Sequence, residues 1–266
     1  MLERFQRPGR RARGHHAEHL DLDLDLDVDL HLDVDLNLHE HQHHHHVDHD
    51  HHHPARHRAD RTPGPLQGGS KGKRTLAIQQ ALKDQHYDPG ELDGKFGAKV
   101  RMAVWAYQGL HGMPQDGIVG PDLEALILAR SPQPMFRPEL GPTHTEVDLT
   151  RQVMMVFRDG APVLITHVST GSQIPYCEET DQGRNCGNAV TPEGTYKFGR
   201  RVSGWRDAPL GRLYNPVYFN GGIAVHGANS VPGHPASHGC VRIPMSIAEY
   251  FPALVNTGDV ITVYRS

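Results

Sequence analysis

The first seventy residues restrict what this chain can fold into, because they hold almost no material for a core. Residues 20–38 read LDLDLDLDVDLHLDVDLNL, with Asp at most alternate positions. Strict alternation is the pattern of a β-strand, but like charges opposed across a ladder repel each other. We therefore expect a disordered, low-complexity tail and linker over residues 1–72, ending in the Pro/Gly/Ser-rich run TPGPLQGGSKG.

A histidine-rich run, HEHQHHHHVDHDHHHPARH, lies within this tail and holds a large share of the 22 histidines of the chain. Neutral imidazole is a good ligand for Zn, Ni or Cu, so one interpretation is a metal-binding tract. The run has no cysteine and no fixed ligand spacing, and it therefore defines no coordination geometry. We favour a solvated tail without a metal site, and keep metal binding by the tract as the alternative.

The rest of the chain is nearly neutral and long enough for two modest domains. The tail holds 8 Arg and 13 Asp or Glu, whereas the whole chain has a net charge of −4. A neutral body offers no electrostatic footprint for nucleic acid or an anionic membrane. No apolar run reaches the roughly 18 residues of a membrane helix. Three arginines at 10, 11 and 13 resemble the start of an export signal, but no apolar segment of roughly 7–15 residues follows them.

Residues 73–131 show helical periodicity in three segments, and the expected core residues are Leu76, Ile78 and Leu82, then Val100, Val104 and Tyr107, then Leu123, Leu126 and Ile127. The pentapeptides DGKFG (93–97) and DGIVG (116–120) echo each other as glycine-bearing turns before a helix. This predicts a small three-helix bundle. Its IQQAL, DGKFG, AVWAYQ and DGIVGP segments resemble the common bacterial peptidoglycan-binding domain; an unspecialised helical bundle is the alternative.

Residues 143–266 change to the pattern of strands. Alternating or β-branched runs occur in TEVDL, RQVMMVF, APVLITHV, GGIAVHG and DVITVY, with a hairpin turn at Arg158, Asp159 and Gly160. MSIAEYFPALV predicts a short helix that is interrupted near Pro252. The expected fold class is therefore α+β and multidomain: a three-helix bundle, then a mostly antiparallel β domain with long loops.

The segment AVHGANSVPGHPASHGCVR (224–242) places three histidines, a serine and a cysteine where Gly and Pro prevent a regular helix. Cysteine attacks as the thiolate, and it needs a base within reach and a cationic or donor-rich setting. His226 is a candidate base for Cys240, and Gly227 and Gly239 allow close backbone approach. Backbone N–H groups from Ser237 onward would form an oxyanion hole. A structural zinc site, a buried apolar cysteine and a disulfide half are the alternatives for this thiol.

The motifs VDLTRQVMMVF, VSTG, TPEGTYKF, IAVHG and SHGCVR occur in that order over about residues 146–264. This order resembles the L,D-transpeptidases, the YkuD-like family of bacterial cell-wall enzymes. The resemblance implies a cysteine acyltransferase in which Cys240 attacks the carbonyl of the third residue of a peptidoglycan tetrapeptide stem and releases the terminal D-Ala. It also implies that His226 is the base and that the Gly227 carbonyl orients its ring.

The resemblance gives the remaining site residues their roles. Ser237, His238 and Gly239 would line the acyl site and oxyanion hole, with His238 as an orienting residue. Arg242 would fix the loop or meet a substrate carboxylate. No metal or organic cofactor is implied, and carbapenem β-lactams are the expected covalent inhibitors.

The resemblance further implies that the thioester passes to a side-chain amine of a neighbouring stem, which gives a 3→3 cross-link. With water as acceptor the activity would be that of an L,D-carboxypeptidase. A cysteine peptidase acting on the same stems is a second enzyme interpretation, although such families place Cys before His in the chain. A non-catalytic wall-binding or metal-binding protein is the alternative from another class.

Two further cysteines lie nine residues apart in the polar segment CEETDQGRNC, which we expect to be a long loop. With Cys240 assigned to catalysis, Cys177 and Cys186 suit one disulfide, and two free thiols are the alternative. A disulfide requires an oxidising compartment. This agrees with an extracytoplasmic enzyme of the cell wall, although no export signal is visible in the sequence.

Overall fold

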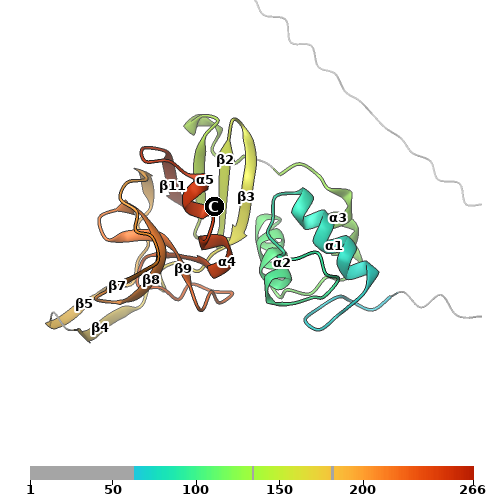
Figure 1. Ribbon diagram of the computed structural model, residues 1–266, viewed down its shortest axis with the longest axis horizontal. Helices are drawn as coiled ribbons and strands as arrows, with labels where there is room; N and C mark the ends of the chain where they lie inside the picture. Colours follow the sequence, from blue (N-terminus) through green and yellow to red (C-terminus); the bar gives the residue numbers. More distant parts are fainter. Residues whose placement is uncertain (1–62, 134, 181–182) are drawn as a thin grey trace, which may run out of the picture. The chain divides into compact units, whose positions relative to one another are not determined.

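The computed structural model describes residues 63–133, 135–180 and 183–266 (Figure 1), so most of the predicted tail lies outside the described residues. Three helices come first: α1 (Lys73–Asp84), α2 (Ala98–Leu110) and α3 (Pro121–Ala129). Eleven strands follow within the described ranges, together with the short helices α4 (Met245–Ala248) and α5 (Phe251–Leu254). The predicted α+β architecture, a helical module before a mostly β domain, is confirmed.

A buried glutamine from the preceding helix holds each of the two echoing turns of the helical module. The Gln79 carboxamide accepts the glycine N–H of the first turn at 2.7 Å and donates to Asp93 Oδ1 at 3.0 Å. The Gln108 carboxamide accepts the glycine N–H of the second turn at 2.9 Å and donates to Asp116 Oδ1 at 2.6 Å. The internal repeat of the sequence is therefore a repeat of one helix–turn hydrogen-bond unit.

The core of this module differs from the predicted one at two positions. Leu76 and Leu126 are 40% and 43% exposed, because each lies off the buried face of its helix. Leu66, within the predicted linker, is buried instead and exchanges backbone hydrogen bonds with Val119 at 2.8 and 2.9 Å. Part of the predicted linker therefore packs on the helical module.

The β domain contains two larger sheets and a separate hairpin. The first sheet has the order β3-β2-β1-β11-β6 and the second β10-β9-β8-β7, while β4 and β5 pair with each other. All pairs are antiparallel except β1–β11 and β9–β10. The strands are β1 (His144–Asp148), β2 (Val153–Arg158), β3 (Ala161–His167), β4 (Pro175–Thr180), β5 (Gly183–Asn188), β6 (Gly194–Lys197), β7 (Trp205–Ala208), β8 (Gly211–Asn220), β9 (Ile223–Ala228), β10 (Val241–Pro244) and β11 (Val260–Tyr264).

Strand β2 is buried on both faces, whereas RQVMMVF was interpreted above as an alternating or β-branched run. Met154 and Val156 belong to the core of the β domain. Val153, Met155 and Phe157 belong to a second core, which they share with the three helices. A strand covered on both faces is a continuous apolar run rather than an alternating one. The helical module thus covers the second face of this sheet.

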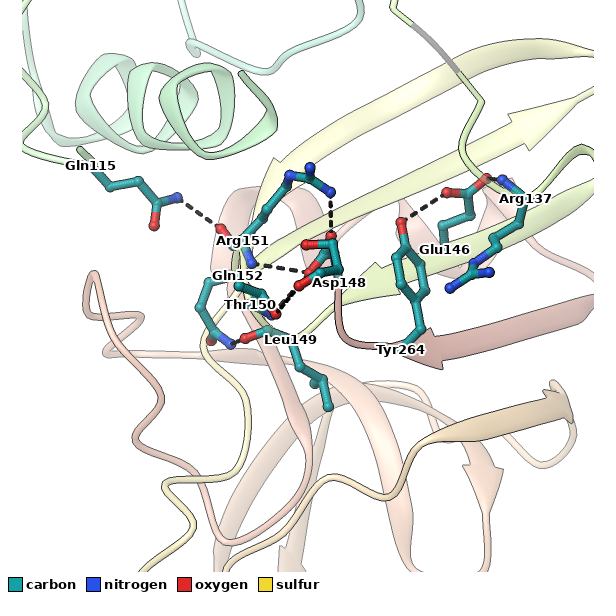
Figure 2. Close-up of polar contacts among 10 residues, drawn as sticks. Gln115, Arg137, Glu146, Asp148, Leu149, Thr150, Arg151, Gln152 and Tyr264 are labelled. Atoms are coloured by element: carbon teal, nitrogen blue, oxygen red, sulfur yellow. Dashed lines mark hydrogen bonds and ion pairs between the residues drawn. The ribbon is translucent and has the colours of Figure 1, made fainter. Parts of the chain in front are cut away.

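Direct hydrogen bonds also join the module to the sheet. Gln115, which follows α2, donates to the Arg151 carbonyl at 2.9 Å, and the Arg151 guanidinium donates to Asp148 at 2.8 Å (Figure 2). At β3, the Ile165 N–H donates to the His86 carbonyl at 2.9 Å. Residues from 63 onward belong to one compact unit. None of the helices within the described ranges is long and apolar enough to cross a membrane.

Candidate active site

Two parallel neighbouring strands bring the predicted thiol and imidazole to one cavity. In the register of β9 and β10, Arg242 is the partner of His226. Cys240 immediately precedes β10, two residues before Arg242, so these three residues lie close to one another. They line a common cavity of about 660 Å³. The long loop between the strands therefore brings the Cys240 thiol and the His226 imidazole to one cavity.

The His226 ring is held by its neighbouring carbonyl. Its Nδ1 lies 2.9 Å from the Gly227 oxygen, so Nδ1 carries the hydrogen and Nε2 keeps a free lone pair. Burial lowers the pKa of His226 to about 4; the Gly227 hydrogen bond opposes this shift and the Arg242 charge adds to it. A side chain at position 227 would place its Cβ 2.6 Å from that of Ala248, which explains the glycine. The His226 imidazole is therefore neutral near pH 7.

Cys240 is a free, partly buried thiol. Its Sγ donates to the Gly222 carbonyl at 3.9 Å. Burial raises the pKa of Cys240, although a hydrogen bond from the Ala224 backbone and the Arg242 charge both oppose the shift. The cationic setting predicted from the sequence would favour the thiolate. Arg242 does supply the charge, but desolvation outweighs it, and thiol and imidazole are both neutral at rest.

The backbone before Cys240 is a tight turn stabilised by Ser237. The Ser237 hydroxyl donates to the Cys240 carbonyl at 2.5 Å and accepts the Gly239 N–H at 3.0 Å. The Ser237 N–H donates to the Thr170 carbonyl at 2.9 Å. Two of the N–H groups expected in the oxyanion hole are thus engaged within the fold. Gly239 has a φ of +137°, and a Cβ there would lie 2.8 Å from the Val190 carbonyl, so glycine is required.

Two residues that were not predicted as site residues from the sequence stabilise this turn through hydrogen bonds. Thr191 donates to the Gly239 carbonyl at 2.7 Å and accepts the Gly171 N–H at 2.8 Å. Gln152 donates to the Thr170 hydroxyl at 2.8 Å. Thr191 is the first residue of the TPEG motif, and it joins Gly171 of VSTG to Gly239 of SHGC, so these motifs were the available signal. Gln152 lies in the VDLTRQVMMVF motif, but only the tertiary fold places it next to this loop.

His238 points to a different partner from His226. Its Nε2 lies 2.8 Å from Glu178 Oε1, and its ring meets the Tyr176 ring edge-on at a centroid distance of 4.7 Å. Both partners belong to β4, and the β4–β5 segment is a hairpin rather than the expected long loop. A disulfide joins Cys177 to Cys186, which are direct cross-strand partners.

The wall of the cavity is cationic, amide-rich and aromatic. None of the described residues that line it is Asp or Glu. Its charged members are Arg212 and Arg242, and Arg212 lies over the ring of Trp205 at 4.6 Å. The other polar and aromatic members include Asn185, Asn188, Asn229, Tyr176 and Tyr218. Such a wall suits an elongated ligand that carries carboxylates and amides.

Comparisons with known proteins point in the same direction. The family model of the L,D-transpeptidase catalytic domain (YkuD) matches residues 142–263, and that of a putative peptidoglycan binding domain matches residues 71–127. The L,D-transpeptidase from Xylanimonas cellulosilytica DSM 15894 is 34% identical, with a TM-score of 0.68, over 76% of this chain and 98% of its own. The L,D-transpeptidase (Yku) from Stackebrandtia nassauensis is 22% identical, with a TM-score of 0.41, over 75% of this chain and 94% of its own.

No curated protein matches the chain with significance. The solved structure from Xylanimonas nevertheless matches this chain over both the helical module and the β domain. One family model matches the helical module and the other matches the β domain. The chain belongs to the L,D-transpeptidase family, with a peptidoglycan-binding module followed by a YkuD catalytic domain.

Proposed function

We propose that this protein is an L,D-transpeptidase that forms 3→3 cross-links between peptidoglycan stems through a thioester on Cys240. The observation that supports this most directly is the shared cavity of His226, on β9, and Cys240, which immediately precedes the parallel strand β10. The nitrogen of His226 that is not bonded to the Gly227 carbonyl is free to accept a proton. A thiol beside a fixed neutral imidazole is the arrangement that acyl transfer requires.

In the first step, the Cys240 sulfur attacks the carbonyl between the third stem residue and the terminal D-Ala, while His226 Nε2 takes the thiol proton. The negative charge moves to the carbonyl oxygen, and the N–H groups of His238 and Cys240 donate to it. When the tetrahedral intermediate collapses, the C–N bond breaks and His226 returns the proton to the leaving amine. Neutral thiol and neutral imidazole suit this route, because proton transfer then accompanies attack.

In the second step, the side-chain amine of the diamino acid in a neighbouring stem attacks the thioester. A new amide bond forms, the C–S bond breaks, and the proton from the amine restores the Cys240 thiol through His226. Water in place of the amine would give a tripeptide stem, which is L,D-carboxypeptidase activity. The supporting feature is the cavity of about 660 Å³ that Cys240 lines.

The position of the charges supports a peptidoglycan stem as substrate. Stem peptides carry free carboxylates, and Arg242 and Arg212 are the cations of the cavity wall. We assign Arg242 to a donor-stem carboxylate, since it lies beside the reacting sulfur. The helical module would hold the glycan strand nearby and raise the local concentration of stems. A disulfide and two wall-directed domains support an extracytoplasmic location.

The test is to incubate the full chain with a disaccharide-tetrapeptide and analyse the products by mass spectrometry. We expect free D-Ala and a dimer with one D-Ala fewer than two donors, and neither product from Cys240→Ala. A carbapenem should add its mass to the peptide that contains Cys240. A tripeptide monomer alone would assign the carboxypeptidase instead, and binding without any product would support a non-catalytic wall protein.

The pH dependence of kcat/KM should show the low basicity of His226. Its pKa is lowered to about 4, so the base is neutral at every pH above that value and is lost only as the pH falls through it. We expect the acid limb of kcat/KM near pH 4, well below the usual histidine value of about 6.5. Alkylation of Cys240 by iodoacetamide should accelerate only at alkaline pH, because the thiol pKa is raised. An acid limb near pH 6.5 would contradict the burial of the base.

A further inference from the structure

The β4–β5 hairpin has no evident role in the stability of the fold. Its residues are largely exposed, in contrast to the strands of the two larger sheets. Figure 1 shows it projecting from the β domain as a separate pair of strands. An isolated two-stranded hairpin is only marginally stable in water, and the Cys177–Cys186 disulfide offsets that weakness. A covalently closed hairpin that lacks a core of its own calls for another explanation.

The hairpin contacts His238 of the loop that precedes Cys240. Two side chains of β4 on the same face reach it, since Tyr176 and Glu178 are two residues apart. Glu178 Oε1 lies 2.8 Å from Nε2 of the ring, and Tyr176 packs edge-on against it. Cys177 lies between them in the strand, so the disulfide anchors the pair of contacts. Gly187 opposite leaves space for the Tyr176 ring, since a Cβ there would lie 3.0 Å from the tyrosine oxygen.

This contact contributes little to stability. The side chains of His238 and Glu178 are 28% and 46% exposed, and ion pairs at that exposure contribute about 0–1 kcal/mol. The contact does, however, determine the tautomer and the orientation of the His238 ring. A carboxylate at Nε2 places the hydrogen of the neutral imidazole on that nitrogen, so Nδ1 keeps its lone pair and the ring is held in one orientation. His238 lines the same cavity as Cys240 and follows Ser237 directly.

We propose that Glu178 is a positioning residue for acyl transfer: with Tyr176 it holds His238 at the acyl site, and the disulfide-closed hairpin holds Glu178. His238 carries one of the two N–H groups assigned to the oxyanion, so a ring that swings freely would also loosen that donor. The β4–β5 hairpin is thus a part of the active site that lies outside the segment 224–242. This inference rests on the proposed function.

The experiment compares Glu178→Ala, Glu178→Gln and Glu179→Ala in the full chain, with the disaccharide-tetrapeptide as substrate. Glu179 is the matched control, because it is the adjacent residue of the same strand and pairs with Arg184 at 3.2 Å, away from the loop. We expect Glu178→Ala to lower kcat about tenfold with little change in donor KM. Glu178→Gln, which can still accept from Nε2, should recover part of kcat. Glu179→Ala should match the wild type.

A double-mutant cycle with His238→Ala shows whether Glu178 acts through that ring. In the His238→Ala background, Glu178→Ala should cause no further loss, because the group it positions is gone. Equal kcat in the Glu178→Ala and Glu179→Ala variants would overturn the proposal, and so would additive losses or a parallel fall in Tm. A wild type that fails to process the stem would refute the proposed function instead, so the two failures are distinguishable.

Discussion

Replacing His226 with alanine is expected to lower the rate at which a stem substrate acylates Cys240 by about 10²–10⁴-fold, the loss typical of a missing general base. The reason is that the thiol is neutral at rest and burial raises its pKa. It must therefore transfer its proton as it attacks, and Nε2 of His226 is the free nitrogen in the shared cavity. Single-turnover formation of the acyl-enzyme, followed by mass spectrometry, measures the rate.

Two histidines of the same loop serve as comparisons. His234 is exposed, and His234→Ala should retain the wild-type rate. His238→Ala should reduce turnover less than His226→Ala, because its ring is paired with Glu178 rather than held for proton transfer from the thiol. Should His238→Ala cause the larger loss of acylation, the roles of the two imidazoles must be exchanged.

Ile165→Ala is expected to destabilise the helical module and the β domain together, by about 2–5 kcal/mol. Ile165 is fully buried on β3 and belongs to the core that the sheet shares with the helices. Its N–H also donates to the His86 carbonyl of the module. Because one core spans both parts, loss of its packing should lower the free energy of unfolding of the whole unit rather than that of one part.

The two tryptophans of the chain allow this to be measured, since Trp105 lies in α2 and Trp205 in β7. In single-tryptophan variants, both fluorescence signals should report one coincident thermal transition. Val163→Ala is the matched control: it lies two residues away on the same strand but is 36% exposed, so its effect should stay within about 0.5 kcal/mol. Two separate transitions, of which Ile165→Ala moves only one, would show that the core is not shared.

Local patterns predicted the elements well where a single segment determines them. The DGKFG and DGIVG turns, the Arg158–Gly160 hairpin turn and the interruption near Pro252 all appear as expected, because turn chemistry depends on a few adjacent residues. The hairpin at β4–β5 was missed, since CEETDQGRNC is polar on both faces. Its pairing is stabilised by the disulfide and cross-strand hydrogen bonds rather than by an apolar pattern.

The sequence by itself indicated the candidate thiol, imidazole and glycines, because SHGC preceded by HG places them in one continuous segment. Three properties depend on parts of the chain that are distant in sequence. Burial sets the protonation of His226 and Cys240, Glu178 reaches His238 from another hairpin, and the helices cover the second face of β2. Only the tertiary structure decided these, since desolvation and packing depend on what surrounds a residue in space, and a motif records only its neighbours along the chain.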